Sequence, residues 1–452
     1  MNKRIIISIM FLLSFKMVLS QSILTEYIEI GLENNQQYLK EKLNTKISIE
    51  ESKQAKSLFF PDVSFDASYT LADGGRTIDF PAGQLFNPAY ATLNQLTGTE
   101  QFPTNIEDIN EQFLPNDFHE TKIQLLQPIL NTDIFYGYKA RQANISVAQA
   151  KEESYENELI FQITKAYFNH LQLLEQQTIL DSTKTLINEL IRVNEKLIKN
   201  DVATKEVLYD SKAQLDEVNA QIATIKKSIN TSKIFFNFLL NRDLNEPILA
   251  IGGDELNFVS NDLTLQTVQE EAIANRSEIK QINSGLEAQE YLIKREEGYI
   301  IPDISVGAEA GYQGFGYTFD ENQDYYLVGF NLNWPIFQAG RNKSKVSKAK
   351  LQKDQLSADY KNITNQIKLE VATAFYELEE ALQVYKARTS ALKNVSENFN
   401  IVRGKYRVNQ VLLVQFNEAR NNLTTARLAA SIAKYNITIA KANLDKTIQI
   451  TR

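Results

Sequence analysis

The sequence predicts an α+β membrane protein, in which amphipathic strands continue into unusually long helices and the whole arrangement occurs twice. The first observation is a heptad repeat of apolar residues within Arg341–Val408, a segment that contains no proline. Residues seven positions apart in it are Tyr385, Leu392, Phe399 and Tyr406. At ~1.5 Å per residue, such a helix spans roughly 100 Å. The second observation is four shorter segments in which apolar and polar residues alternate, as in strands with one lipid-compatible face.

The composition narrows the chemistry that the chain can carry. It has 452 residues, of which 43% are hydrophobic, and it has no cysteine, which excludes disulfides, thiolate metal sites and a cysteine nucleophile. With 48 basic against 56 acidic residues, the formal net charge is −8. Because an acidic chain is a poor partner for nucleic acid, we expect no nucleic-acid binding.

Residues 1–20 are typical of a secretory signal peptide. They combine two basic residues, an apolar stretch and small residues before the expected cleavage point, namely Lys3, Arg4, Ile5–Phe15, Val18 and Ser20. The apolar stretch of about 11 residues is too short to span a bilayer, which argues against a membrane anchor. We therefore expect an exported chain that starts at Gln21.

Four segments are predicted as strands, namely Val63–Leu71, His119–Leu126, Ile304–Tyr312 and Tyr326–Trp334. Their length of about nine residues suits a tilted strand that crosses a bilayer. Between the first two strands lies Asp73–Asp117, which contains four prolines and four glycines. This segment is predicted as a long irregular loop.

Helices are predicted at six places, each with apolar residues at steps of three and four. They are Ile23–Leu58, Thr132–Asn200, Val202–Leu240, Leu263–Glu297, Arg341–Val408 and Leu412–Lys446. Both halves of the chain have the same order, which is helix, strand, loop, strand, very long helix, turn and return helix. We therefore divide the chain into a signal peptide (1–20), a first repeat (21–243), a linker (244–262) and a second repeat (263–452).

Four strands are too few to close a barrel, and an open sheet edge is not tolerated in lipid. Several copies of the chain must therefore share one barrel, in which two copies (2 × 4) would give eight strands and three copies (3 × 4) would give 12. Eight strands leave an interior filled by side chains, whereas the polar strand positions here are rich in Ser, Gly and Asn and suit a wet lumen. On this ground we favour three copies.

The duplicated junctions resemble those of the TolC-type outer-membrane efflux proteins, over essentially the whole mature chain. The motifs are a Pro-Asp-x-Ser sequence before a strand in each half, at Pro61 and Pro302, and the strand-to-helix sequences QPIL and WPIF. Residues 196–218 and 405–428 are also similar to the family's helix-hairpin tips. Each motif is weak by itself, but their order and their duplication make the resemblance specific.

The resemblance implies a homotrimer in the outer membrane, with a 12-stranded β-barrel that continues into a long α-helical coiled-coil barrel in the periplasm. It also implies a passive, gated export duct for tripartite efflux or type I secretion. A periplasmic adaptor (a membrane fusion protein) would couple the duct to an inner-membrane transporter, either proton-driven or of the ABC type. The alternative is a periplasmic coiled-coil scaffold or adaptor, which leaves the lipid-compatible strands without a purpose.

The resemblance places functional residues at the ends of the helical hairpins. The family has glycine at each tip, where this chain has Asn200 and Asn409, and asparagine is the next-best residue for a left-handed turn. The expected tip and adaptor-contact residues are Asn200, Asp201, Asn409 and Gln410. Alignment on the two asparagines places the periplasmic gate, which could equally be a solvated helix face, at Glu206, Gln415 and Glu418.

Aromatic residues near the strand ends are predicted to form an interfacial membrane belt, with ordinary rim packing as the alternative. They are Tyr69, Tyr312, Tyr325, Tyr326 and Trp334. His119 and His170 are far apart in sequence and are predicted as surface or helix-face residues rather than as metal ligands. The sequence contains no nucleophile–base set, phosphate loop or cofactor fingerprint, so we expect no catalytic, cofactor or metal site and no enzyme activity.

Overall fold

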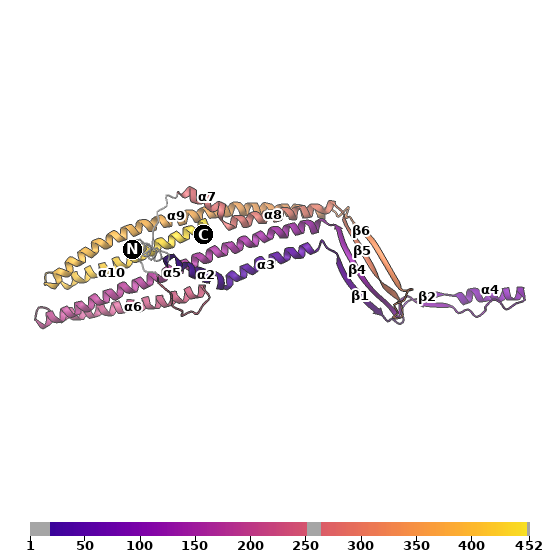
Figure 1. The fold of residues 1–452 in the computed structure, drawn as a ribbon, viewed down its shortest axis with the longest axis horizontal. Coiled ribbons are helices and arrows are strands. Elements are labelled where there is room, and N and C mark those ends of the chain that lie inside the picture. Colours follow the sequence, from indigo (N-terminus) through magenta and orange to yellow (C-terminus); the bar gives the residue numbers. More distant parts are fainter. Residues whose placement is uncertain (1–18, 251–263, 450–452) are drawn as a thin grey trace, which may run out of the picture. The chain divides into compact units, whose positions relative to one another are not determined.

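The computed structural model describes residues 19–250 and 264–449 of the chain (Figure 1). Nearly all of the predicted signal peptide and most of the predicted linker therefore lie outside the described residues. The chain divides into two compact units. The helical unit consists of residues 1–50, 142–289 and 351–452, and the strand unit consists of residues 51–141 and 290–350.

The helices follow the predicted order along the chain (Figure 1). They are α2 Leu19–Asn34, α3 Gln36–Ser57, α5 Thr132–Lys199, α6 Glu206–Leu239, α7 Leu265–Asn275, α8 Ser277–Glu297, α9 Arg341–Arg407 and α10 Leu413–Ile448. The two very long helices are confirmed, since α5 has 68 residues and α9 has 67. Each has two basic residues in its last turn, which interact favourably with the negative end of the helix dipole. In the described part of the chain, no helix combines the length and the apolar content that crossing a membrane requires.

Two helices that the sequence predicted as continuous are each interrupted at one residue. The predicted helix Ile23–Leu58 is split at Asn35, whose side-chain oxygen accepts hydrogen bonds from the backbone N–H groups of Gln37 (3.1 Å) and Tyr38 (3.0 Å) and so caps α3. The predicted helix after the linker is split at Arg276, whose ψ of 127° lies outside the helical region. The apolar pattern continues across both positions, so periodicity alone did not reveal the breaks.

The core of the helical unit is a series of side-chain clusters placed along the helices. In one of them, Tyr27, Tyr167 and Phe236 pack with ring centroids 5.0 to 5.8 Å apart. These three rings come from α2, α5 and α6, so the cluster joins the first helix to both arms of the α5–α6 hairpin, which we call the first hairpin. Burial of one such side chain contributes roughly 1.5–3 kcal/mol. We call α9–α10 the second hairpin.

The strand unit contains an antiparallel sheet of order β1-β4-β5-β6 (Figure 1). Its strands are β1 Asp62–Thr70, β4 Phe118–Leu130, β5 Asp303–Phe315 and β6 Asp324–Asn333. All four predicted strands are confirmed, and β4 and β5 run several residues beyond their predicted ends. β4 continues beyond its predicted end at Leu126 and past Pro128, where its register with β5 shifts. Within the described residues β1 and β6 are the outer strands, and each has one neighbour.

The prediction of an irregular loop at Asp73–Asp117 is wrong, because most of this segment forms strands and a helix. β2 Thr77–Phe80 and β3 Ile109–Gln112 form an antiparallel ribbon, and α4 Ala82–Thr97 lies between them (Figure 1). We call Thr77–Gln112 the extension. Pro81 directly precedes α4 and Pro88 lies within it, so the proline content did not signify absence of structure. The extension joins β1 to β4 at the same end of the sheet as the β5–β6 connection, because Phe118 is opposite both Thr70 and Phe315.

Candidate functional site: a two-faced sheet and two linked hairpins

One face of the sheet is apolar across all four strands. The pairing register places Phe65 opposite Ile123, Ile123 opposite Ala310, and Ala310 opposite Tyr326, so these side chains form one row. The row is uncovered in the single chain, with Phe65 68% and Tyr326 84% exposed, and Phe330 on the same face of β6 is 81% exposed. An apolar surface of this extent indicates contact with lipid or with another protein.

The opposite face of the sheet carries a network of charged and polar side chains. Lys122 Nζ lies 2.7 Å from Glu120 Oε1 and 3.4 Å from Glu309 Oε2. Gln124 Nε2 donates a hydrogen bond of 3.0 Å to Glu309 Oε2. Glu120, Lys122 and Gln124 belong to β4 and Glu309 belongs to β5, so the network joins two neighbouring strands on this face. A face of this kind is compatible with water and incompatible with the interior of a bilayer.

The five residues of the predicted aromatic belt do not all lie together. Tyr69 and Tyr312 lie at the extension end of the sheet, where they pack against Tyr317 (5.6 Å between centroids) and Phe319 (5.4 Å) of the β5–β6 connection. Tyr326 points outward from the apolar face, and Trp334 directly follows β6 at the other end and is 50% exposed. Tyr325 does not lie where the prediction placed it, because its side chain is on the polar face of the sheet.

The alternation of β6 explains the position of Tyr325, because it precedes Tyr326 and must point the other way. Its hydroxyl donates a hydrogen bond of 3.4 Å to Glu120 Oε1. Tyr325 therefore belongs to the polar network and not with the lipid-compatible aromatic residues. The prediction placed it by its position near a strand end and ignored its side of the strand.

Both histidines are buried, whereas the sequence predicted them as surface or helix-face residues. His119 is fully buried at the extension end of the sheet, with Nε2 2.7 Å from Gln323 Oε1. His170 is 4% exposed on α5, and its Nδ1 lies 2.8 Å from Ser232 Oγ of α6. Burial lowers the pKa of His170, and the charge of Lys233 lowers it further. No group of three or more metal-ligating side chains occurs in the described ranges, and each histidine has a packing role.

Each hairpin turns at a residue with a positive φ. In the second hairpin this residue is Asn409 (φ 58°), as predicted, and in the first it is Asp201 (φ 56°) rather than Asn200. Both ends have the same backbone hydrogen bond. It runs from Val202 N to Leu197 O in the first hairpin (2.9 Å) and from Gln410 N to Lys405 O in the second (2.9 Å). The predicted tip residues are Asn200, Asp201, Asn409 and Gln410, and all four are exposed.

The observed turns shift the alignment of the two hairpins by one residue. When Asp201 is matched with Asn409 (409 − 201 = 208), Glu418 corresponds to Asp210 (210 + 208 = 418) rather than to a residue next to it. The three predicted gate residues, Glu206, Gln415 and Glu418, are exposed in the first two turns of α6 and α10. Gln415 Oε1 also accepts a hydrogen bond of 3.1 Å from Leu412 N, so it caps α10. The role of these residues as a gate stays a prediction.

Near their ends the two hairpins are linked by buried polar side chains that the sequence analysis did not single out. Tyr406 of α9 donates a hydrogen bond of 2.7 Å to Asn194 Oδ1 of α5. Asn194 Nδ2 in turn donates to Ser211 Oγ of α6 at 2.8 Å. Burial raises the pKa of Tyr406, so this hydroxyl stays protonated and available as a donor. The sequence analysis identified Tyr406 only as an apolar heptad residue. Its hydroxyl was the feature that could have indicated the link to Asn194.

Two further links join α6 to α10. Asn417 Nδ2 donates to Asp210 Oδ2 at 2.9 Å, and the guanidinium of Arg420 donates to Gln214 Oε1. Arg420 is 2% exposed, and its Nε and Nη1 atoms have no partner within the described residues. Burial lowers the pKa of Arg420, while the charge of Asp210 opposes this effect. A side chain that is so buried and so incompletely paired makes this contact sensitive to any movement of the hairpins.

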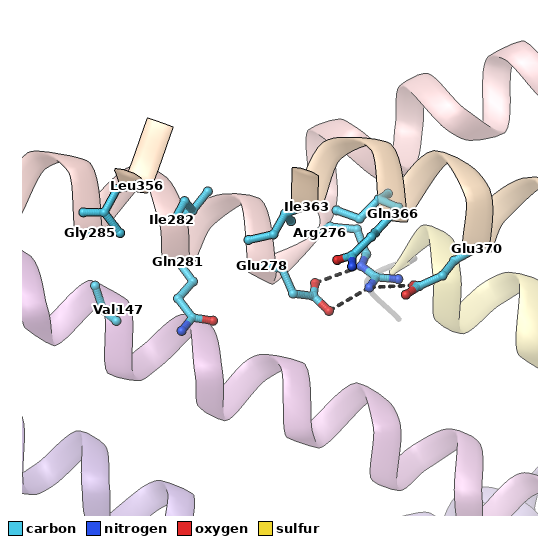
Figure 2. Close-up of a pocket in the computed structure, with 11 residues that line it drawn as sticks. Val147, Arg276, Glu278, Gln281, Ile282, Gly285, Leu356, Ile363, Gln366 and Glu370 are labelled. Atoms are coloured by element: carbon cyan, nitrogen blue, oxygen red, sulfur yellow. Dashed lines mark hydrogen bonds and ion pairs between the residues drawn. The ribbon is translucent and has the colours of Figure 1, made fainter. Parts of the chain in front are cut away.

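A cavity of about 370 Å³ lies among α5, α8 and α9 in the helical unit (Figure 2). At one end of it, the buried guanidinium of Arg276 binds both oxygens of Glu278 (2.8 and 2.7 Å) and one oxygen of Glu370 (3.1 Å), as Figure 2 shows. Its Nη1 also donates to Thr447 O (3.3 Å). These contacts hold the break between α7 and α8 against α9 and α10, and they are structural rather than catalytic in geometry.

Comparisons with known proteins agree with this architecture. The family model for outer membrane efflux proteins matches residues 268–448. The probable efflux pump outer membrane protein TtgC of Pseudomonas putida is 24% identical over 233 residues, which cover 50% of this chain and 46% of TtgC. The match thus spans about half the length of that curated relative. The outer membrane protein TolC of Escherichia coli is 18% identical over 343 residues, which cover 72% of this chain and 68% of TolC.

Solved structures of outer membrane proteins share the fold over nearly the whole chain. The CmeC outer membrane channel of Campylobacter jejuni matches with a TM-score of 0.76 and 17% identity, covering 94% of this chain and 85% of CmeC. The outer membrane protein VceC of Vibrio cholerae matches with a TM-score of 0.74 and 16% identity, covering 94% and 95%. TtgC is named as an efflux pump outer membrane protein and CmeC as an outer membrane channel, while TolC and VceC are named as outer membrane proteins. The resemblance to the TolC-type outer-membrane efflux proteins is therefore confirmed, by the family model over residues 268–448 and by the shared fold over most of the chain.

Proposed function

We propose that the chain forms the outer-membrane channel of a tripartite efflux or type I secretion system, and that it acts as a passive, gated export duct. The observation that carries the proposal is the sheet with one exposed apolar face and one polar face. A protein confined to the aqueous periplasm, such as a coiled-coil scaffold, would have no use for an uncovered row of Phe65, Tyr326 and Phe330. In a barrel, the same row faces lipid and the Lys122 network faces the lumen.

The chain closes this barrel as a homotrimer. Its outer strands β1 and β6 need partners, since an unpaired sheet edge is not tolerated in lipid. Pairing β1 of one copy with β6 of the next in three copies gives 12 strands (3 × 4), an interior wide enough to hold water. The duplicated halves, residues 21–243 and 263–452, then contribute two strands each, and the very long helices form the wall of a periplasmic tunnel.

The hairpin ends form the periplasmic gate in this proposal. The links from Tyr406 to Asn194 and from Asn417 to Asp210 hold the two hairpins together and support a closed resting arrangement. A periplasmic adaptor would contact the exposed tips at Asp201 and Asn409, and its binding would favour separated hairpins. The adaptor connects the duct to an inner-membrane transporter, proton-driven or ABC, which supplies the energy. The chain itself performs no catalysis.

The two faces of β6 offer a matched test of the barrel. Phe330 is on the apolar face, whereas Leu327 is opposite Glu309 on the polar face and is also well exposed, at 57%. Phe330→Lys should prevent stable insertion in outer membranes, because a lysine facing lipid costs about 2–4 kcal/mol near the bilayer midplane. Leu327→Lys should insert normally. Equal insertion of both variants, or recovery of the unmodified chain as a periplasmic monomer, would contradict the proposed channel.

Single-channel conductance in planar bilayers tests the gate. Replacing Glu206 and Glu418 by alanine should raise the conductance, because both residues are exposed in the first two turns beyond the hairpin tips and their long side chains would narrow the constriction. The same replacement at Glu397, an exposed acid farther along α9, is the control. If the double variant conducts like the unmodified channel, these acids are ordinary solvated side chains.

A further inference from the structure

The helix of the extension is tied to the rest of the chain along one side only. Asn87 exchanges two hydrogen bonds with the backbone of Ile106 (both 2.8 Å), and Asn94 exchanges two with the backbone of Phe102 (2.7 and 3.0 Å). The same side includes Gly83, where a Cβ atom would lie 2.3 Å from Ile106 O. The returning segment therefore lies closely against this side of α4 and covers it.

The opposite side of α4 is apolar and uncovered. It carries residues at steps of four, four and three, namely Leu85, Ala89, Leu93 and Leu96, and we call them the α4 stripe. At ~100° per residue, the stripe occupies a sector of roughly 80° that faces away from Asn87 and Asn94. The three leucines are 57%, 38% and 78% exposed. Regular apolar spacing on one exposed helix side is the pattern of a helix that packs against another helix.

The charges of the extension argue against a membrane surface as the partner. Residues 77–112 contain no Lys, Arg or His, and their five acids are Asp79, Glu100, Glu107, Asp108 and Glu111. A helix that lies on a membrane typically presents Lys and Arg on its polar side to anionic headgroups, and this segment presents none.

The same charges are compatible with a second copy of the chain. None of the acids lies on α4, and Asp108 is held on the other side of the helix, where its carboxylate accepts a hydrogen bond of 3.2 Å from Gln84 N. Two stripes can therefore meet without like-charge contact. The β2–β3 ribbon that carries α4 also exposes Ile78, Phe80 and Ile109. The extension therefore buries too little apolar surface to be stable without a partner.

The topology brings copies of the extension together. The extension begins seven residues after the last residue of β1 (77 − 70 = 7), an outer strand, which in the proposed barrel pairs with β6 of the next copy. We propose that the α4 stripes of neighbouring copies pack against one another in a helix cluster beyond the end of the sheet. This inference rests on the proposed assembly of several copies, and it adds a second contact between the copies outside the barrel.

Disulfide trapping tests the cluster, because the chain has no cysteine of its own. Leu93→Cys places a thiol in the stripe, and Ala91→Cys places one on the same helix, exposed and well away from the stripe. A disulfide requires Cα atoms within about 7 Å, so mild oxidation of outer membranes should give at least about fivefold more covalent dimer for Leu93→Cys than for Ala91→Cys. Dimers are read on non-reducing gels, and assembly of each variant is measured by native mass.

The outcomes separate the two proposals. If Leu93→Cys assembles into trimers but gives no more covalent dimer than Ala91→Cys, the helix cluster is wrong and the channel proposal stands. If the unmodified chain does not assemble in mild detergent, the channel proposal and the helix cluster are both wrong. Trimers with selective trapping at residue 93 would support both.

Discussion

The two hairpins share one backbone design but contribute different groups to the contact between them. Each turns at a left-handed residue, Asp201 or Asn409, with the same closing hydrogen bond. The second hairpin supplies the donors Tyr406, Asn417 and Arg420. The first hairpin supplies the acceptors Asn194, Asp210 and Gln214. Duplication has thus preserved the fold of the two arms while their side chains have become complementary.

The hairpins also differ in how their ends are held. The second has an aromatic cluster close to its turn, in which Phe416 lies 5.7 Å from Phe399 and 4.9 Å from Tyr406 between ring centroids. Near the turn of the first hairpin, α6 buries only the polar Ser211 among the described residues, and its first buried apolar residues, Val218 and Ile222, lie farther from the turn. The difference teaches that aromatic packing, in which Leu190 of α5 takes part, holds the end of the second hairpin, whereas α6 of the first hairpin is joined to this region by polar links.

The largest expected effect comes from removing the aromatic cluster. Phe416→Ala should lower the free energy of unfolding by ~3–5 kcal/mol, because the ring is 5% exposed and leaves a cavity. Its counterpart in the first hairpin is Leu208 (208 + 208 = 416), which is only partly buried, and Leu208→Ala should cost less than half as much. Thermal unfolding in detergent measures both variants. Equal losses of unfolding free energy in the two variants would contradict the proposed difference between the ends of the two hairpins.

The next effect comes from the hydroxyl that joins the hairpins. Tyr406→Phe keeps the ring but leaves Asn194 Oδ1 buried without this donor, which should cost about 1–3 kcal/mol. Hydrogen exchange should accelerate at the end of α5 more than at the end of α9, since the first hairpin depends on the link. The control is Tyr209→Phe, whose side chain is 66% exposed on α6. Faster exchange in α9 alone would reverse the assigned dependence.

Glycine substitutions at the turns test the one-residue shift between the hairpins. Asp201→Gly and Asn409→Gly should each stabilise the chain by up to about 1 kcal/mol, because glycine adopts positive φ without a steric penalty. Asn200→Gly should instead destabilise it by up to ~1 kcal/mol, because this residue lies at the end of α5 without positive φ. Melting temperatures decide the sign. Stabilisation by Asn200→Gly would restore the alignment that the sequence suggested.

The smallest effect is a pH dependence confined to the first hairpin. The folded-state pKa of His170 lies below its ordinary value of 6.5, so the folded chain binds this proton less readily than the unfolded chain does. The stability contribution is complete above pH 6.5 and decreases as the pH falls below it. We expect a lower melting temperature at pH 5 than at pH 7, and a smaller difference in His170→Gln. An unchanged difference in the variant would assign the effect to other groups.

The sequence predicted the elements whose pattern repeats over many residues. The heptads of Arg341–Val408 and the alternation of the four strands were sufficient, because burial on one side fixes both periods. Features that depend on single contacts were not predicted. The breaks at Asn35 and Arg276, the order within the extension and the left-handed turn at Asp201 each depend on a few hydrogen bonds.

The site was predicted less completely than the fold. The tip and gate residues followed from a resemblance, and their roles stay predictions, whereas the links between the hairpins were missed. Arg420 and Asn417 were ordinary polar helix residues by sequence, and only the facing hairpin makes them partners of Gln214 and Asp210. Tyr325 was misplaced for a different reason, because its side of the strand was available from the alternation and was not used.

The breaks at Asn35 and Arg276 have a mechanical consequence. A rod made of one continuous helix resists bending along its whole length, whereas a rod of two helices joined at one residue concentrates its compliance at the joint. The joint at Asn35 is held by a neutral bond from its Nδ2 to Leu239 O (3.1 Å). The joint at Arg276 is held by the carboxylates of Glu278 and Glu370, and Glu370 is 52% exposed. Because salt screens exposed ion pairs, we expect added salt to weaken the joint at Arg276 more than the joint at Asn35, so that the bending of the helical unit would become less even as ionic strength rises.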